Sequence, residues 1–516
     1  MKAKLNESEL VEANAAPAFD IQKNMINQTT CIHRLRRLTR IGLFVFAWAV
    51  AQTDTAKAAT SGPEVQPMNV VMILADDMRW DAFGAGGSDF IHTPNLDRLA
   101  EQNVQFTNAY VTTSICNVSR ASILTGQHME AHGVDRFGKT IDAKFDQSYP
   151  GVLREAGYWS GHVGKDHLEV ATSEHFDFVR SYELHHWFEI DGERVHVTER
   201  NARDSMQFLQ ERPKDRPFLL NLSFFAPHAE DRNPKQYLPQ DWSARHYRDV
   251  VIPESEKMHH SYLEALPDFL SQPRNEGRKR FDRRFTSPQH YQESMTNYFR
   301  LITEIDAVVG QVIEELKAQG VYENTLIIFA GDNGYFHADR GLADKWYPYE
   351  ESIRVPLLIH DPRLPRSSRG IQREQMVLNI DIAPTIVQAV GLPVPKTMQG
   401  VDLAPLYLGD SMPPWREEFF YSHPTISYKE RIPTSQAVVR EDMKYVYWPE
   451  WSQEQLFDLR SDPTEKHNQA ENSDYAAQLE FFRARLQSWL EWAESPEKSE
   501  EKPFGPASTK ITNECN

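Results

Sequence analysis

The 516-residue chain has 40% hydrophobic and 25% charged residues, a composition typical of soluble globular proteins. Its length allows about two to four domains, and its net charge of −18 excludes a global positive field that would attract DNA, RNA or an anionic membrane. We therefore expect no nucleic-acid partner, and local lysine and arginine side chains must provide any attraction for an anionic substrate.

Residues 1–58 are predicted to be an N-terminal extension that ends in a secretory signal peptide. Arginines lie between Arg34 and Arg40, before the apolar run 41–51, and Ala56 and Ala58 form a small-residue cleavage site. The apolar run is shorter than the roughly 20 residues that a membrane-spanning helix needs. The alternative, a buried core helix, leaves the arginine cluster unexplained. We expect export to the periplasm or the medium, and no membrane span in the mature chain.

Strands alternate with helices over residues 66–412, which we predict to be the larger domain. Continuous apolar runs, typical of parallel strands buried on both faces, begin near Asn69, Tyr158, Phe218 and Thr325. Helices are predicted over 93–103 and 198–211, and a longer one carries an apolar face from Tyr298 to Leu316. This alternation predicts a doubly wound α/β domain.

The pattern changes after Pro413, where short strands follow one another at the spacing of an antiparallel meander. A closing helix is predicted over 474–493. Residues 413–500 are therefore expected to form a smaller α+β subdomain of antiparallel sheet and helix, and 501–516 a tail. The predicted fold class is α/β, with a large doubly wound sheet flanked by helices and this smaller subdomain.

Residues 232–292 are polar, and we expect them to form an irregular insertion. Within them, PRNEGRKRFDRRF carries six basic residues: Arg274, Arg278, Lys279, Arg280, Arg283 and Arg284. This run has two interpretations, a surface that holds a polyanionic glycan or a solvated loop. Because charge runs usually solvate a surface, the second is slightly favoured.

Charged and coordinating side chains follow several of the predicted strands. They are Asp76 and Asp77, Lys165 and His167, His228, and Asp332 and Asn333. Each group alone is common in turns, but the carboxyl ends of parallel strands meet at one sheet edge, where open α/β sheets bind ligands. Carboxylate and amide oxygens suit Ca²⁺ or Mg²⁺. The basic residues Arg120, Lys165 and Lys345 then require an anion, and a sulfate or phosphate group fits them.

Cys116 is one of only three cysteines, with Cys31 and Cys515. It lies between polar residues, and after signal-peptide cleavage only Cys515, on a polar tail, would remain as a partner. A large core hardly needs that disulfide, so Cys116 is either a small buried hydrophobe or a residue with a chemical role.

The segment CNVSRASILTG, residues 116–126, resembles the signature of the formylglycine-dependent (type I) sulfatases of the alkaline phosphatase superfamily. Further segments resemble that family in the same order. They are NVVMILADDMRWD, GYWSGHVGKDH, FFAPH, FAGDNGYF, GLADKWYPYEESIRVPLL, DIAPTIVQAVGLP and EQLFDLRSDPTEKHNQ. The resemblance covers almost the whole mature chain, and it extends to secreted bacterial carbohydrate sulfatases.

The resemblance implies that a formylglycine-generating enzyme oxidises Cys116 to formylglycine (3-oxoalanine), whose hydrated aldehyde attacks the sulfate ester. It implies a Ca²⁺ site, with Mg²⁺ as the alternative, formed by Asp76, Asp77, Cys116, Asp332 and Asn333. It further assigns catalytic roles to Arg120, Lys165, His167, His228 and Lys345. The expected mixed sheet is that of the alkaline phosphatase superfamily, and the expected substrate is a sulfated carbohydrate or polysaccharide.

Three positions depart from the family pattern. Val118 replaces the usual proline or alanine, Asp166 replaces a tryptophan, and Arg340 replaces a histidine and is predicted only to contact substrate. Two alternative functions also stay open. One is hydrolysis of phosphate or phosphonate esters on the same scaffold, and the other is non-catalytic binding of sulfated glycans because Val118 blocks conversion.

Overall fold

The computed structural model describes residues 67–409 and 411–493. The predicted signal peptide, Cys515 and the tail 501–516 lie outside the described residues, and their predictions remain expectations. Within the described ranges, no helix combines the length and apolar character needed to cross a membrane.

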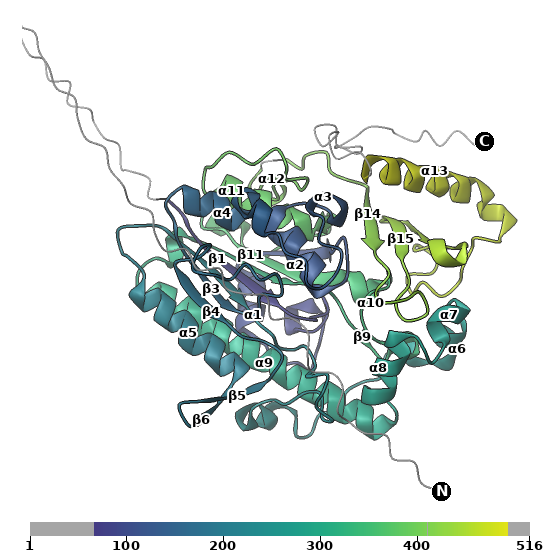
Figure 1. Ribbon diagram of the computed structural model, residues 1–516, viewed down its shortest axis with the longest axis horizontal. Helices are drawn as coiled ribbons and strands as arrows, with labels where there is room; N and C mark the ends of the chain where they lie inside the picture. Colours follow the sequence, from purple (N-terminus) through teal and green to yellow (C-terminus); the bar gives the residue numbers. More distant parts are fainter. Residues whose placement is uncertain (1–66, 410, 494–516) are drawn as a thin grey trace, which may run out of the picture. The chain divides into compact units, whose positions relative to one another are not determined.

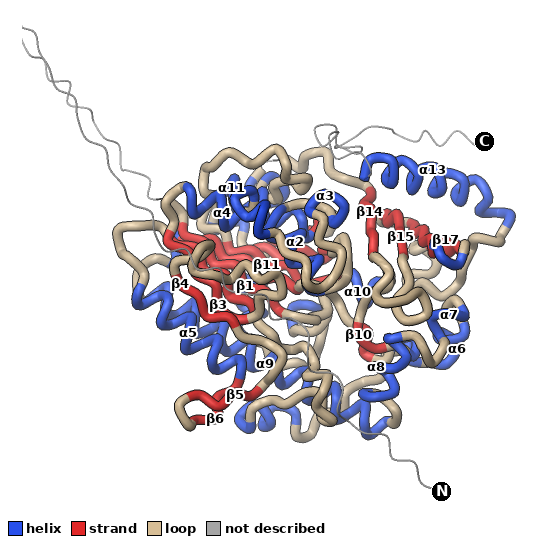
Figure 2. The backbone as a smooth tube through the Cα atoms, in the orientation of Figure 1, coloured by secondary structure: helices blue, strands red, loops and turns tan. Residues whose placement is uncertain are grey.

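The central sheet has nine strands in the order β12-β2-β11-β8-β1-β7-β3-β4, with β13 also paired to β2. Figure 2 draws its strands in red and labels β1, β3, β4 and β11 among them. Their bounds are β1 Asn69–Ala75, β2 Val104–Tyr110, β3 Trp159–Gly164, β4 Phe178–Ser181, β7 Phe218–Ser223, β8 Thr325–Gly331, β11 Arg354–His360, β12 Ile371–Arg373 and β13 Val377–Leu378. Only β11 is antiparallel to its neighbours β2 and β8; the other pairs in this sheet are parallel. The predicted mixed, doubly wound sheet is confirmed.

Helices cover both faces of this sheet because its strands are apolar on both sides. In β1, Val70 and Met72 pack into one hydrophobic cluster, and Val71 and Ile73 pack into another. The first cluster includes side chains of α2 (Cys116–Thr125), α4 (Tyr149–Glu155) and α11 (Ile382–Ala389). The second includes side chains of α1 (Pro94–Gln102), α5 (Val197–Glu211) and α9 (Pro288–Ala318), as Figure 1 shows for α5 and α9.

The predicted antiparallel sheet and closing helix are also present. Strands β14 (Glu418–His423), β15 (Ser435–Arg440), β16 (Met443–Trp448) and β17 (Gln453–Asp458) form a meander, and the helix is α13 (Ala476–Ala493). Phe420 and Val438 pack with α13, whereas Phe419 and Val439 belong to the main core. The period-two alternation of strands thus packs one face of this sheet against the main core and the other face against α13.

The expectation of an irregular insertion over 232–292 is correct only for its first half: residues 232–259 contain the 3-10 turns Asp241–Tyr247 and Glu256–Met258 but no α-helix or strand. Residues 260–284, in contrast, are largely helical. This segment contains α6 (His260–Glu264), α7 (Asp268–Ser271) and α8 (Glu276–Arg284). Asn275 caps α8 by accepting hydrogen bonds from the backbone N–H groups of Gly277 and Arg278. The basic run is therefore helical over most of its length, and Arg284 within it is fully buried.

Buried histidines make the stability of the fold sensitive to acid. His132 is 3% exposed, its Nδ1 accepts the backbone N–H of Val134, and burial and Lys144 lower its pKa to about 3. Burial also lowers the pKa of His186 to about 4 and that of His423 to about 3. These pKa values lie below the value of about 6.5 that a histidine has in an unfolded chain. The contribution of these neutral histidines to the free energy of unfolding is therefore complete above pH 6.5, and it is lost as the pH falls from there toward 3.

We therefore expect the free energy of unfolding to fall by about 1.4 kcal/mol per pH unit for each such histidine between pH 6 and 4. Urea unfolding at pH 7.5, 6 and 5 measures this slope. His132→Gln should reduce the slope relative to the wild type because it removes one titrating group. Equal stability at pH 7.5 and pH 5 would contradict the expectation.

Candidate active site

The charged residues predicted at strand ends meet at one edge of the sheet. Strands β8, β1, β7 and β3 are adjacent and parallel, so their carboxyl ends lie side by side. Asp76 follows β1, Lys165 follows β3 and Asp332 follows β8, while His228 lies in the loop after β7. Ligand atoms of Asp76, Asp77, Cys116 and His228 all lie within 4.8 Å of one another. The convergence expected from the sequence is present in the structure.

Cys116 enters this cluster as the first residue of α2. Its Sγ lies 3.2 Å from Asp76 Oδ1 and 3.0 Å from Lys345 Nζ. Arg120 follows one helical turn later and also reaches the cluster, while Val118 packs in the hydrophobic core. The helix therefore presents Cys116 and Arg120 to the site, and its apolar side holds it against the sheet.

The carboxylates and Asn333 form an oxygen-rich group. Asn333 Nδ2 donates to Asp77 Oδ1 at 2.6 Å, and Asp332 Oδ1 accepts the backbone N–H of Asp77 at 3.1 Å. Burial raises the pKa of Asp77 to about 7, with Asp76 and Asp332 adding to the rise and Lys345 opposing it. The buried Oδ1 of Asn333 has no hydrogen-bond partner among the described residues. Crowded carboxylates and an unused amide oxygen fit a hard divalent cation such as Ca²⁺ or Mg²⁺.

Three buried cationic side chains surround these carboxylates. Lys165 pairs with Asp76, Lys345 pairs with Asp77, and Arg120 Nε lies 2.9 Å from Asp332 Oδ2. Although burial lowers the pKa of Lys165, the Asp76 carboxylate offsets this and the net shift is upward, so Lys165 stays charged at neutral pH. The Nη2 atom of Arg120 is buried and has no partner within the described ranges. The site therefore combines a cation-binding group with donors suited to an oxyanion.

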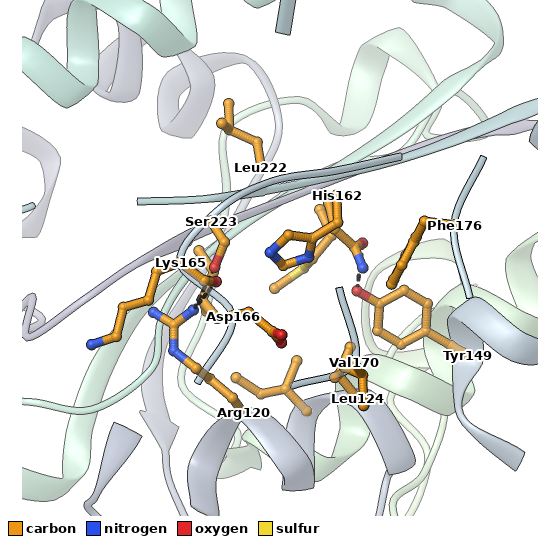
Figure 3. A pocket seen from close by; sticks show the side chains of 14 residues that line it. Arg120, Leu124, Tyr149, His162, Lys165, Asp166, Val170, Phe176, Leu222 and Ser223 are labelled. Atoms are coloured by element: carbon orange, nitrogen blue, oxygen red, sulfur yellow. Dashed lines mark hydrogen bonds between the residues drawn. The ribbon is translucent and has the colours of Figure 1, made fainter. Parts of the chain in front are cut away.

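Ser223, the last residue of β7, is a site residue that the sequence analysis missed. It accepts a hydrogen bond from Arg120 Nη1, which also donates to the Lys165 carbonyl oxygen at 3.1 Å. Figure 3 shows Arg120, Lys165 and Ser223 together on one side of a cavity that is also lined by His162 and Tyr149. Only its position in the sequence could have indicated this role, because Ser223 ends β7, and the neighbouring strands β1 and β3 are each followed by a charged residue.

The two predicted histidines contact different carboxylates, His228 that of Asp77 and His167 that of Glu183. His228 Nε2 lies 3.6 Å from Asp77 Oδ2, and its Nδ1 donates to the Ala229 carbonyl oxygen at 2.7 Å. Burial lowers the pKa of His228 to about 3, Lys165 adding to the fall and Asp76 opposing it. His167 Nε2 lies 3.4 Å from a carboxylate oxygen of Glu183, another residue that the sequence analysis missed. Burial followed by the charge of Lys165 lowers the pKa of His167. Both imidazoles are therefore neutral at pH 7 in the structure.

Several residues of the site have left-handed backbone conformations. Asp77 and His167 each have a φ of 61°, and Asp344 and Trp346, which flank Lys345, have φ of 78° and 87°. Left-handed conformations of residues other than glycine cost on the order of 1–3 kcal/mol and persist where the surroundings enforce them. Their placement at three site segments indicates that these side chains are held in fixed directions.

Arg340 does not join this cluster. It is fully buried, with its guanidinium 3.5 Å from a Glu351 carboxylate and 3.3 Å from that of Glu465, and it donates to the Thr464 carbonyl oxygen at 2.6 Å. This placement does not support the predicted substrate contact, because the guanidinium is buried and already paired with carboxylates. Arg340 instead links its own segment and Glu351 to the segment that follows β17.

We expect Arg340→Met to lower the free energy of unfolding by about 3–5 kcal/mol, because it leaves the buried carboxylates of Glu351 and Glu465 without this partner. Urea unfolding measures the change. The control is Arg283→Met on the exposed side of α8, which should stay within about 0.5 kcal/mol of the wild type. Equal stability of the two variants would contradict a structural role for Arg340.

Comparisons with known proteins agree with this arrangement. A family model described as "Sulfatase" matches residues 68–392, and one described as "N-sulphoglucosamine sulphohydrolase, C-terminal" matches residues 338–491. The arylsulfatase of Clostridium perfringens is 27% identical over 83% of this chain and 95% of its own length. The N-acetylglucosamine-6-O-sulfatase of Bacteroides thetaiotaomicron is 24% identical over 80% of this chain and 84% of its own.

Solved structures share the fold. BT4656, solved with its substrate D-glucosamine-2-N,6-O-disulfate, superposes with a TM-score of 0.69 and 22% identity, covering 84% of this chain and 100% of that one. The phosphonate monoester hydrolase of Agrobacterium radiobacter superposes with a TM-score of 0.68 and 23% identity, covering 83% and 96%. Both likenesses show that the fold is shared.

Proposed function

Because the chain belongs to the sulfatase family, we propose that it hydrolyses sulfate esters of a carbohydrate through a formylglycine made from Cys116. The observation that carries this proposal is the position of Cys116. It opens α2 in a group with the buried carboxylates of Asp76 and Asp77 and with His228, while Lys345 lies 3.0 Å from its sulfur and Arg120 one turn away. A cation-binding group, an oxyanion-binding group and one modifiable side chain meet at this point.

The unmodified thiol is a poor nucleophile in this setting. Burial and the Asp76 carboxylate raise the pKa of Cys116 well above its usual value, so the thiolate that would attack is disfavoured. A formylglycine hydrate at this position supplies the attacking hydroxyl, and its second hydroxyl allows sulfate release and return to the aldehyde. A formylglycine-generating enzyme is the maturation partner that this proposal requires.

The proposed metal ligands are Asp76, Asp77, Asp332, Asn333 and the modified residue 116. Their hard oxygen atoms suit Ca²⁺, with Mg²⁺ as the alternative. The buried Oδ1 of Asn333 accepts no hydrogen bond from the described residues, which leaves it able to bind such a cation. When bound, the cation supplies Lewis acidity and offsets the mutual repulsion of the carboxylates.

The other side chains divide between charge stabilisation and proton transfer. Arg120 orients the oxygens of residue 116, and Lys165 and Lys345 stabilise charge on the sulfate group. His228, together with Lys345, protonates the leaving oxygen, and His167 accepts a proton in the release step. Because His228 is neutral in the substrate-free site, it takes up a proton from solvent when the substrate binds, since the anionic sulfate group favours the imidazolium.

The substrate class is proposed from the relatives. An N-acetylglucosamine-6-O-sulfatase and a structure holding a disulfated glucosamine are among them, which supports a sulfated carbohydrate or polysaccharide. The predicted signal peptide supports action in the periplasm or outside the cell, where such polymers occur. Fractionation of the native host should recover the protein outside the cytoplasm; retention in the cytoplasm would contradict this part of the proposal.

The phosphonate hydrolase that shares this fold makes phosphate or phosphonate ester hydrolysis the second candidate. The test compares kcat/KM on 4-nitrophenyl sulfate, 4-nitrophenyl phosphate and 4-nitrophenyl phenylphosphonate, which share one leaving group. The proposal expects the sulfate to be favoured by about tenfold or more. A preference for either phosphorus ester would replace it with the second candidate. Binding of sulfated glycans without turnover of any ester would favour the non-catalytic alternative.

A further inference from the structure

Helix α8, which carries the basic run, lies against two segments of the site. Its residue Arg284 is fully buried and uses all three of its guanidinium nitrogens. The Nε atom donates to Gln236 Oε1 at 2.9 Å, and Nη2 lies 2.8 Å from Asp231 Oδ1. The Nη1 atom lies 3.1 Å from Asp344 Oδ2 and also donates to the Tyr335 hydroxyl. One side chain thus joins three separate segments of the chain.

Each of these segments carries a proposed site residue. Asp231 lies three residues after His228, and Asp344 directly precedes Lys345. Tyr335 lies two residues after Asn333, and its hydroxyl is 3.1 Å from that of Tyr237. Arg284 therefore connects the loop that carries His228 with the loop that carries Lys345, the two residues proposed to protonate the leaving oxygen.

Arg280, one turn earlier on α8, repeats this connection. It pairs with Asp231, its Nε lies 2.9 Å from Glu276 Oε1, and the same nitrogen is 3.8 Å from Asp344 Oδ2. Burial raises the pKa of Asp344, but Lys345 and Arg284 lower it by more, so Asp344 is ionised. Two arginines of α8 therefore lie against the same two carboxylates. These belong to Asp231 and Asp344, which come from the two loops that the arginines connect.

We propose that Arg284, supported by Arg280, is a positioning residue that holds His228 and Lys345 together for proton delivery to the leaving oxygen. The inference rests on the proposed function, because only that function gives these two residues a shared task. The planar guanidinium suits the role, since its fixed fork can hold two carboxylates and a hydroxyl in one geometry, which an ammonium cannot. Displacing a proton donor by about 1 Å is enough to cost a large factor in rate.

Leaving-group dependence provides the test. The 4-nitrophenolate ion leaves easily, whereas the phenolate ion is a stronger base and depends more on protonation. We expect Arg284→Lys to lower kcat by about tenfold to a hundredfold on phenyl sulfate, by a several-fold smaller factor on 4-nitrophenyl sulfate, and to leave KM for both nearly unchanged. The matched control is Arg283→Lys, its exposed neighbour on α8, which should behave like the wild type. All variants are produced together with a formylglycine-generating enzyme.

Asp231→Asn gives a second measurement should Arg284→Lys fail to fold, because Asp231 is partly exposed, at 35% of its side chain. It should show the same selective loss on phenyl sulfate. Equal loss on both substrates in the folded variant or variants, or no loss in either, would overturn the positioning role. Absence of turnover of both sulfates by the wild type would instead refute the proposed function, so the two failures are distinguishable.

Discussion

Cys116→Ala is expected to lower kcat/KM for 4-nitrophenyl sulfate by about 10⁴-fold or more, since it removes the precursor of the attacking hydroxyl. The side chain is small and buried beside Asp76 and Lys345, so alanine should fit without rearranging α2. Steady-state kinetics measures the loss, and the thermal unfolding temperature shows whether the fold is retained. A variant that keeps a tenth of the wild-type activity would contradict the assignment of Cys116.

Cys116→Ser is the matched variant for the same position. A serine hydroxyl can attack sulfur, but its sulfate ester lacks the second hydroxyl that would expel sulfate. We therefore expect at most one turnover and a sulfated residue at position 116, visible by mass spectrometry. Multiple turnovers by this variant would contradict the need for an aldehyde.

Asp77→Asn is expected to have the second largest effect, about 100-fold or more on kcat/KM, together with weakened calcium binding. Asp77 is in contact with Lys345 and Asn333, and it lies 3.6 Å from His228, so its charge is shared by the metal group and the proton donors. Thermal unfolding with and without Ca²⁺ gives a measurement that is independent of turnover. Calcium at about 100 times its Kd should stabilise the wild type by about 2.7 kcal/mol.

The control for this variant is Asp89→Asn, a substitution of an exposed aspartate near the same strand. It should keep both the activity and the calcium-dependent rise in unfolding temperature. A wild-type response to calcium in Asp77→Asn would remove Asp77 from the metal site, even if activity were lost.

Much of the fold and site was predictable because the relevant signals are local. The apolar runs near Asn69 and Thr325 specify buried parallel strands, and the acids that follow them must then lie at the same sheet edge. The meander after Pro413 was equally clear, since its alternating residues have to face two different layers. Placing Cys116 among these acids needed the family resemblance in addition.

The residues that escaped prediction depend on long-range packing. Arg284 belongs to a run that resembles a solvated surface, but its partners Asp231, Tyr335 and Asp344 lie 51 to 60 residues away along the chain. Glu183 and Ser223 are isolated polar residues whose roles appear only when His167 and Arg120 are placed beside them. Arg340 lies close to the site in sequence, but it turns into a buried ion-pair cluster with Glu465.

Mass spectrometry of the peptide that contains Cys116 tests the central claim most directly. The protein is purified from its native host, digested and treated with a hydrazide that labels aldehydes. Conversion of Cys116 to formylglycine predicts a peptide that has lost its sulfur and carries the hydrazone. An unmodified thiol at Cys116 throughout the native protein would contradict the account.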